Sequence, residues 1–485
     1  MNLNLPPVNL GSIGAEIILA IAASIILISG VFFPKAKKEI FGIMGLFGIV
    51  FAFIYNFYYW GKPAQIVFSG MLIVDKLGIF ISSVFLLAAF ITILLSFSYL
   101  KIEKINHFEY YVLIILSVIG MILMVKSQDL IMLFLGLETL SLSIYVLAGF
   151  LRDDPKSNEA SLKYFLLGAF SSAFFLYGIA LTYGACGTIK LDLIAEQIAQ
   201  AGLLHDKFML MGLSLLLVGF AFKVALVPFH MWVPDVYEGA PIPITAFMSV
   251  APKAAGFVAL LRVVVFALSE MQMEWGPIFW VLSVLTMTIG NIIAISQTSI
   301  IRMLAYSSIA HAGYILIGLT AANEIGNAGV LYYLLAYTFM NLGAFGVVIV
   351  IAEKGKGRTN IEDYSGMAGS YPLLAVTMAI FMFSLAGIPP FAGFFGKFYV
   401  FSGAIKAGYI WLAIIGVFNS LISVYFYLRV TVMMYMKDPA QEFGPVNFAP
   451  GIIIALILTV FFTLEMGIVP SCYIEIAKES IMLLM

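Results

Sequence analysis

The sequence predicts an all-α polytopic membrane protein with about fourteen transmembrane helices, on the evidence of its composition and of its apolar runs. Of the 485 residues, 62% are hydrophobic and only 11% are charged, whereas soluble domains carry about 25% charged residues. Apolar runs of about 18–25 residues recur from end to end, and a helix of that length crosses a bilayer. The runs are continuous and lack the alternation of barrel strands over about ten residues, so helices are favoured over a β-barrel.

The apolar runs divide the chain into fourteen expected spans. The first run follows a neutral leader without the basic region and cleavage site of a secretory signal, so we expect it to be retained as a helix. The expected spans cover residues 13–33, 41–60, 74–99, 108–125, 129–149, 159–184, 208–234, 242–267, 276–296, 300–320, 328–352, 371–406, 409–435 and 450–469.

The basic residues predict the orientation of these spans. The even-numbered loops hold few of them, such as Lys62, Lys126, Lys190 and Lys207. Because loops rich in lysine and arginine stay in the cytoplasm, we expect the odd-numbered loops there and both chain ends outside. The odd-numbered loops contain Lys35, Lys37, Lys38, Lys101, Lys104, Arg152, Lys156, Lys354, Lys356, Arg358 and Lys437.

The polar segment 191–204 lies between the sixth and seventh expected spans. Its composition fits a short amphipathic helix on the outer membrane surface. It fits an ordinary loop equally well, and the sequence leaves both interpretations open.

Three pairs of similar segments, separated by a nearly constant distance along the chain, predict an internal repeat. The offset covers five spans, and because five is odd, the second copy must be inverted in the membrane, as in many transporters. We therefore expect repeats at 108–267 (spans 4–8) and 276–435 (spans 9–13), flanked by a three-helix region at 1–107 and a helix with a tail at 436–485. The pairs are Glu159–Gly168 with Asn327–Ala336, Tyr145–Gly149 with Tyr314–Gly318, and Val227–Phe229 with Pro389–Phe391.

Prolines predict broken helices at matching places in the two repeats. Pro228 interrupts the seventh span, and Pro389 with Pro390 interrupts the twelfth, where Gly387 and Gly393 loosen the chain further. Proline removes a backbone donor and clashes with the preceding turn. Simple kinks are the alternative, but the matching positions favour a functional interpretation.

Glu138 and Lys223 are the first two charges expected inside the membrane. A charge at the bilayer centre costs at least about 2.5–3.5 kcal/mol, so it needs a partner or a use. Glu138 lies mid-span and shares a helix face with Ser141 and Tyr145, whereas Lys223 precedes Pro228 and has no acid on its own helix. Burial without a partner disfavours a charged amine, which suits proton exchange, so the two residues could form a switchable pair. The alternatives are a hydrogen-bonded helix contact for Glu138 and a snorkelling side chain for Lys223.

Lys253 and Lys397 extend this set. Lys253 lies in the eighth span, one turn after Ser249 and directly after Pro252, which could break the helix again. Lys397 follows the second proline break. We interpret both as functional, since each is flanked by apolar residues and neither has an acid nearby in the sequence.

Lys163, His311 and His230 are more ambiguous. Glu159 precedes Lys163 by one turn, and such a pair is an ordinary stabiliser of helices. His311 shares a face with Ser307, Ser308 and Tyr314, which fits either a neutral core histidine or a proton relay. His230 follows Pro228, and an interfacial position would explain it.

The remaining composition excludes several classes of protein. A net charge of −1 gives no basic surface for nucleic acid. Cys186 and Cys472 are isolated, and the four histidines are scattered, so no metal or disulfide pattern is present. No glycine-rich phosphate loop follows a strand. We therefore expect no cofactor in this chain.

Two long segments resemble a known family. Residues 222–246 read FKVALVPFHMWVPDVYEGAPIPITA, and residues 304–314 read LAYSSIAHAGY. Both resemble signatures of the proton-translocating, antiporter-like subunits of respiratory complex I, the NADH–quinone oxidoreductase. The resemblance covers nearly the whole chain, and the YEGAP variant together with Lys253 and Lys397 is most similar to one branch of the bacterial enzyme.

The resemblance implies a function and a set of residues. Glu138, Lys223, Lys253 and Lys397 match the family's proton path, and Lys163 is grouped with Lys223. It implies a translocase subunit in a bacterial inner membrane, with both ends periplasmic, beside sister antiporter-like subunits. Flavin, iron–sulfur clusters and quinone would belong to partner subunits. The alternatives are a subunit of a multi-subunit sodium/proton antiporter and a structural scaffold.

Overall fold

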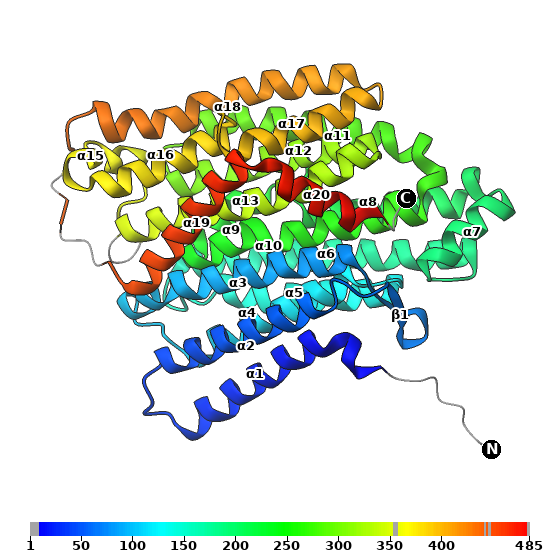
Figure 1. Cartoon of the computed structure of the whole chain (residues 1–485), viewed down its shortest axis with the longest axis horizontal. Helices are drawn as coiled ribbons and strands as arrows, with labels where there is room; N and C mark the ends of the chain where they lie inside the picture. Colours follow the sequence, from blue (N-terminus) through cyan, green and yellow to red (C-terminus); the bar gives the residue numbers. More distant parts are fainter. Residues whose placement is uncertain (1–8, 353–356, 441–442, 445–447, 483–485) are drawn as a thin grey trace.

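The computed structural model describes residues 9–352, 357–440, 443–444 and 448–482, and most of them are helical (Figure 1). The basic loop residues Lys354 and Lys356 lie outside the described residues. A short antiparallel hairpin joins α2 to α3, with β1 at Gln65–Val67 and β2 at Leu72–Val74. The helices are α1 (Gly14–Phe32), α2 (Glu39–Tyr58), α3 (Lys76–Ile102), α4 (Phe108–Val125), α5 (Leu130–Ala148), α6 (Pro155–Cys186), α7 (Leu191–Ala201), α8 (Lys207–Lys223), α9 (Trp232–Gly239), α10 (Ile242–Leu260), α11 (Gln272–Ser296), α12 (Ile300–Ala321), α13 (Glu324–Ile351), α15 (Met367–Ser370), α16 (Pro372–Ala386), α17 (Ala392–Lys406), α18 (Ile410–Met436), α19 (Pro450–Ile468) and α20 (Pro470–Ile481).

Among the described residues, twelve helices are long and apolar enough to cross a membrane. They correspond to twelve of the fourteen expected spans, and their ends lie within a few residues of the expected ones. The seventh and twelfth expected spans each consist of two shorter helices, α8 with α9 and α16 with α17.

Polar side chains fix where several helices begin. The first backbone N–H groups of a helix have no partner within it, and an aspartate or serine just before the helix accepts their hydrogen bonds. This explains why the apolar runs start as helices at defined loop residues. The capping residues include Asp75 before α3, Asp129 before α5, Asp154 before α6, Asp206 before α8 and Ser299 before α12.

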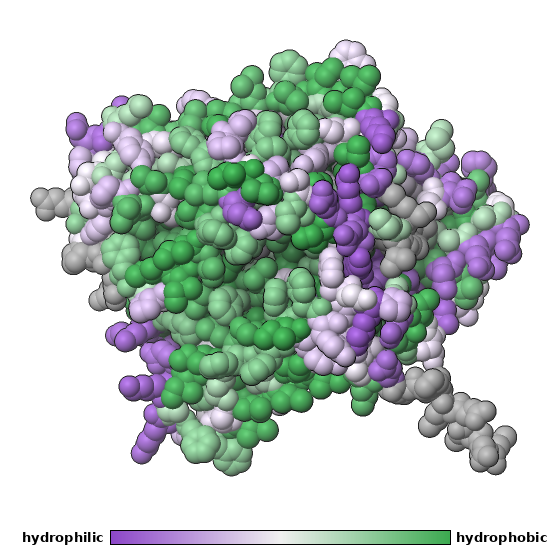
Figure 2. Space-filling model, viewed as in Figure 1, coloured by the Kyte–Doolittle hydropathy of each residue, from purple (hydrophilic) through white to green (hydrophobic). Residues whose placement is uncertain are grey.

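The bundle has central and peripheral helices. The most apolar windows of α10 and α13 are 100% buried, whereas those of α1 and α6 are only 33% and 28% buried. The peripheral helices therefore turn apolar side chains outward, as a bilayer or a partner subunit requires. Figure 2 shows a broad apolar face, with polar residues gathered at its left and right edges, toward the ends of the helices.

Both expected breaks are present. α8 ends at Lys223 itself, and residues 224–231 run without regular helix to α9, with a cis bond before Pro228. α16 ends at Ala386 and is followed by Gly387, whose φ of 86° suits a glycine. α17 begins at Ala392, after a cis bond between Pro389 and Pro390.

Pro252 does not break its helix, so that expectation was wrong. α10 runs continuously from Ile242 to Leu260 with Pro252 inside it. A proline is tolerated within such a span because neighbouring helices and local adjustments satisfy the freed backbone groups. α10 then changes to a π-helix at Leu261–Ala267.

The segment 191–204 is helical over Leu191–Ala201, where it forms α7. Leu191, Ile194 and Ile198 are buried at helical spacing, and the other face is polar. The amphipathic helix was therefore the better of the two interpretations. α7 lies at the same end of the bundle as β1 (Figure 1).

Candidate functional site

Glu138 and Lys223 lie close to a shared set of hydroxyl groups but form no direct ion pair in the described part of the chain. Lys223 Nζ donates to Ser141 Oγ at 2.8 Å, one turn from Glu138 along α5. The Glu138 carboxylate accepts a hydrogen bond from Ser172 of α6. Lys223 is 5% exposed, so it does not snorkel to the interface.

A small cavity lies beside Lys223, between α5, α6 and α8. It has a volume of about 10 Å³ and is lined by Ser141, Ser172 and Lys223 among others. This volume is close to the minimum that one water molecule needs, and the site is polar. The direct Glu138–Lys223 pair that the sequence suggested is therefore replaced by one hydroxyl partner for each residue, Ser172 for Glu138 and Ser141 for Lys223.

Lys253 is buried in the centre of the molecule and is held by α12. Its Nζ donates to the carbonyl oxygen of Ser308 at 2.9 Å and to the Ser308 hydroxyl at 2.8 Å. Ser249, one turn before Lys253, accepts from the Asn341 amide of α13. In the described residues no carboxylate forms an ion pair with Lys253.

α12 carries a row of polar side chains beyond Ser308. His311 Nδ1 lies 2.7 Å from the Tyr333 hydroxyl, and His311 Nε2 lies 3.0 Å from the Tyr427 hydroxyl. Tyr427 also contacts the Ser307 hydroxyl. His311 therefore has an oxygen partner on each ring nitrogen, as a residue that passes a proton between two neighbours requires.

Lys397 lies at the far end of this row. Its Nζ is 4.8 Å from the centre of the Tyr314 ring, one turn after His311 on α12. It donates to the Ala386 carbonyl at 2.8 Å, at the end of α16, and to Ser420 Oγ of α18 at 2.8 Å. The second helix break thus supplies a free carbonyl group as a ligand for the lysine.

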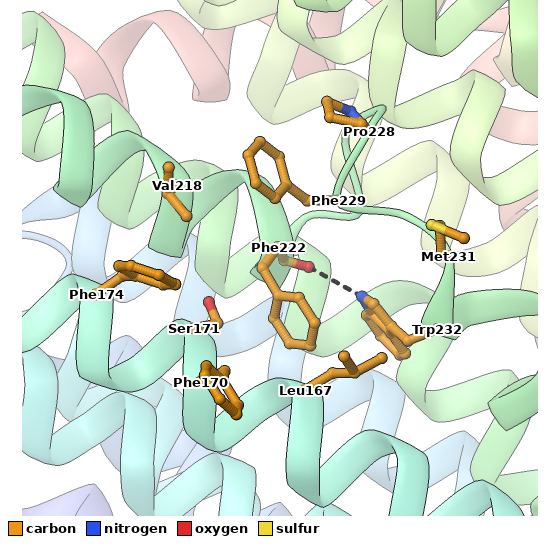
Figure 3. Close-up of a pocket in the computed structure, with 10 residues that line it drawn as sticks. All are labelled: Leu167, Phe170, Ser171, Phe174, Val218, Phe222, Pro228, Phe229, Met231 and Trp232. Carbon is orange, nitrogen blue, oxygen red and sulfur yellow. Dashed lines mark hydrogen bonds between the residues drawn. The ribbon is translucent and has the colours of Figure 1, made fainter.

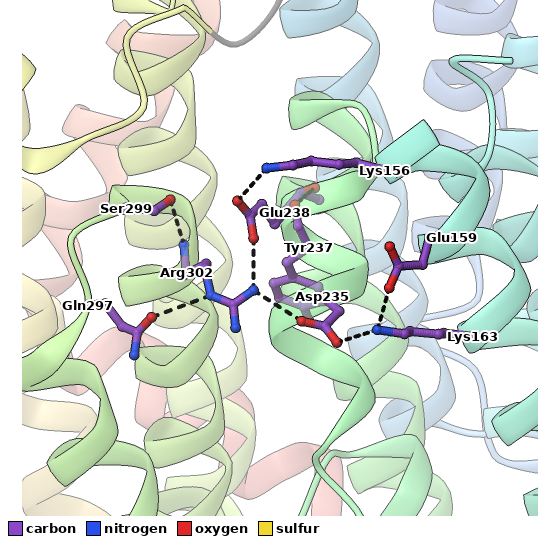
Figure 4. A network of polar contacts seen from close by, with 10 residues as sticks. Lys156, Glu159, Lys163, Asp235, Tyr237, Glu238, Gln297, Ser299 and Arg302 are labelled. Carbon is purple, nitrogen blue, oxygen red and sulfur yellow. Dashed lines mark hydrogen bonds and ion pairs between the residues drawn. The ribbon is translucent and has the colours of Figure 1, made fainter. Parts of the chain in front are cut away.

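Lys163 belongs to a different cluster, near one end of the helices (Figure 4). Its Nζ lies 2.6 Å from Glu159, the i,i+4 partner that the sequence predicts, and 2.8 Å from Asp235 of α9. The Lys163 side chain is 41% exposed. It is therefore not buried, unlike Lys223.

Arg302 continues the Lys163 cluster into α12. Its Nη1 lies 3.1 Å from Asp235 and 2.8 Å from Glu238, and Glu238 also pairs with Lys156 of α6. Apart from Glu159, the carboxylate partners of Lys163 and Arg302 are far away in the sequence, which is why spacing alone did not reveal the cluster. The motif at 222–246 contains both carboxylates of the cluster, Asp235 and Glu238, and was the feature of the sequence that could have indicated it.

The first helix break also forms an apolar cavity (Figure 3). It has a volume of about 230 Å³ and lies between α6, α8 and the segment that carries Pro228 and Phe229. Trp232 Nε1 donates to the Phe222 carbonyl at 3.2 Å across its wall. His230, half-buried on the same segment, has no hydrogen bond to Nδ1 from any described residue.

Two further buried ion pairs had not been expected. Arg262 in the π-helix lies 2.6 Å from Asp75, and both side chains are 2% exposed. Lys126 lies 2.9 Å from Glu16 of α1. The first pair joins the π-helix after α10 to the start of α3, and the second joins the end of α4 to α1.

Comparison with known proteins identifies relatives over nearly the full length. The family model described as NADH:quinone oxidoreductase/Mrp antiporter, transmembrane, matches residues 127–423. NADH-quinone oxidoreductase subunit N of Trichlorobacter lovleyi is 49% identical over 98% of both chains. Subunit N of Chloroflexus aggregans is 42% identical over 100% of this chain and 99% of the relative.

Solved structures share the fold. A chain of respiratory complex I from Thermus thermophilus with bound aureothin has a TM-score of 0.81 and 33% identity, covering 96% of this chain and 99% of that one. A chain of the Mrp complex from Dietzia has a TM-score of 0.84 at 20% identity, covering 97% of each chain, which shows likeness of fold alone.

Proposed function

This chain belongs to the NADH:quinone oxidoreductase/Mrp antiporter family of transmembrane subunits, and from that premise we propose how it moves protons. It is the subunit N type of membrane subunit in an NADH-quinone oxidoreductase, a translocase. Moving one charge against 100 mV requires about 2.3 kcal/mol. We propose that quinone reduction elsewhere in the complex supplies this energy, since we assign no flavin, iron–sulfur cluster or quinone to this chain.

One observation carries the proposal for the path: polar side chains of α12 lie between two buried lysines. Ser308, His311 and Tyr314 follow one another along α12, from the ammonium of Lys253 to that of Lys397. A lone lysine in a bilayer would be costly, and two lysines connected by hydroxyl and imidazole groups provide a series of proton acceptors. We assign Lys253, His311 and Lys397 to the central path.

We assign Glu138 and Lys223 to the start of this path, where they would supply protons to Lys253. The Glu138 carboxylate faces Ser172, and Lys223 faces Ser141, with room for one water molecule nearby. Lys223 side-chain carbons also lie 3.4 Å from the position of a Cβ on Gly256, one turn from Lys253. A change in the charge near Glu138 would draw Lys223 toward α5 or release it toward α10.

We propose fourteen crossings in two inverted five-helix repeats, 108–267 and 276–435, with the broken pairs α8–α9 and α16–α17 in matching places. Residues 1–107 and 436–485 flank them. Both chain ends lie on the periplasmic side of a bacterial inner membrane, as the basic loops favour. The partners are other membrane subunits of the complex, including sister antiporter-like subunits, together with the lipid bilayer.

The test uses the assembled complex, purified and reconstituted in vesicles, with quinone reduction and internal acidification measured together. Glu138→Gln and Lys223→Ala should each lower both rates, because a path without its loading group cannot turn over. Glu196→Gln on the exposed face of α7 is the control and should behave like the parent protein. Full rates in assembled Glu138→Gln complex would contradict the role of the pair, and sodium-dependent exchange without quinone reduction would favour the antiporter alternative.

A further inference from the structure

The short helix α9 lies close to three candidate lysines of the proton path, Lys163, Lys223 and Lys253. Trp232 donates from Nε1 to the carbonyl of Phe222, the residue before Lys223. The same indole stacks on Tyr164, next to Lys163, at 4.3 Å between ring centres and 9° between ring planes. α9 is therefore fixed to the end of α8 and to the N-terminal third of α6 through one side chain.

The other residues of α9 face two directions. The Tyr237 ring is fully buried, and its centre lies 5.9 Å from Lys253 Nζ. Asp235 and Glu238 point away from it toward Arg302, near the start of α12 (Figure 4). A movement of α9 would therefore change the contact between Tyr237 and Lys253 directly. It would also act on α12 through the ion pairs with Arg302.

Asp235 is the junction of this arrangement, because its two oxygens serve two helices. Oδ2 accepts from Lys163 of α6 at 2.8 Å, and Oδ1 accepts from Arg302 of α12 at 3.1 Å. Arg302 lies two turns before His311 along α12 and has a second carboxylate partner in Glu238. The junction thus connects the helix that bears Ser172, the partner of Glu138, to the helix that bears His311.

We propose that Asp235 and Arg302 are positioning residues of the proton path, which pass a change of the Lys163 contact through α9 to α12. The inference rests on the proposed function and assigns these residues no proton of their own. When the Lys163 ammonium moves away from Asp235, the Asp235 carboxylate retains Arg302 as its remaining partner. α9, which carries Tyr237, can then shift relative to Lys253. Half-exposed ion pairs contribute little net stability, so such an exchange is easily reversible.

The test is a double-mutant cycle in the reconstituted complex, with the number of protons pumped per quinone reduced as the readout. Asp235→Asn and Arg302→Met should each lower this ratio by roughly threefold, as expected for residues that couple through direct contact. Lys163→Gln added to Asp235→Asn should cause no further loss, because the contact is already broken. Arg302→Lys keeps the charge and should restore much of the ratio.

Controls separate this inference from a folding defect and from the proposed function. Lys76→Gln removes a half-exposed ion pair with Glu479 and should leave the ratio unchanged. Should Asp235→Asn fail to assemble, Lys163→Gln and Arg302→Met carry the cycle. Fully additive losses for Lys163 and Asp235, or an unchanged ratio in Arg302→Met, would overturn the inference. Absence of acidification in the parent vesicles would instead contradict the proposed function.

Discussion

At the scale of single residues, the buried lysines differ in what holds them. Lys253 and Lys397 are ligated by carbonyl and hydroxyl oxygens, and no carboxylate among the described residues pairs with either of them. Lys126 and Arg262 have carboxylate partners at 2.9 and 2.6 Å. We expect this contrast to separate groups that exchange a proton from groups that hold helices together.

Lys253 therefore gives a test that separates charge from proton exchange. Lys253→Met should lower pumping and quinone reduction at least roughly tenfold, because a proton-transfer group is lost. Lys253→Arg should be equally inactive, since a guanidinium stays charged. Both rates are measured in reconstituted complex. Recovery of activity in Lys253→Arg would show that a fixed charge suffices there.

The Tyr427 hydroxyl is the second test at this scale. Tyr427→Phe leaves His311 Nε2 buried without that partner, at a cost of about 1–3 kcal/mol, and interrupts the row on α12. We expect a lower pumping rate in complex that still assembles. Tyr364→Phe is the matched control, because the buried Tyr364 hydroxyl has no hydrogen bond to any described residue. Equal rates in the two variants would remove Tyr427 from the path.

At the scale of elements, the broken helices determine where the lysines lie. α8 ends at Lys223, and α16 ends beside Lys397, so carbonyl groups at both helix ends accept hydrogen bonds from side chains, Phe222 from Trp232 and Ala386 from Lys397. α17 packs closely at its first turn, where a Cβ on Gly393 would come 1.9 Å from the Ser384 carbonyl oxygen.

Gly393→Ala should therefore displace α17 from α16. Overpacking of this kind costs about 1–3 kcal/mol, and it moves Lys397, one turn further along α17. We expect less assembled complex and a lower rate per assembled molecule, measured by native gel and by quinone reduction. Gly369→Ala has nothing within 4 Å of its new Cβ and should match the parent protein. A normal rate of quinone reduction in Gly393→Ala would mean that the broken pair α16–α17 tolerates a displacement of α17.

The elements were largely predictable from the sequence, whereas their contacts were not. Run length predicted most spans within a few residues, and prolines predicted both breaks. Pro252 was considered as a possible helix break but is none, because one proline within a closely packed span does not end the helix. The Asp235–Lys163 and Arg262–Asp75 contacts join residues 72 and 187 positions apart, and local spacing holds no information on such distances. The roles of Glu138, Lys163, Lys223, Lys253, His311 and Lys397 stay predictions.

At the scale of the whole molecule, fully buried ion pairs should stabilise assembly far more than exposed ones. Arg262→Met leaves Asp75 charged and buried, at a cost of about 3–5 kcal/mol. Lys76→Gln breaks a half-exposed pair worth about 0–1 kcal/mol. We expect a lower midpoint of thermal unfolding for the first variant alone, with partial recovery when Asp75→Asn is added. Equal midpoints for the two single variants would contradict this view.

The complete burial of α10 has a consequence for biosynthesis. α10 carries Lys253 and has no lipid-facing side, yet it leaves the ribosome before α12 and α13, which cover it. A lysine at mid-membrane opposes partition of a single helix into lipid by about 2.5–3.5 kcal/mol. We therefore expect α10 to enter the bilayer less readily alone than in contact with earlier helices such as α3, against which it packs.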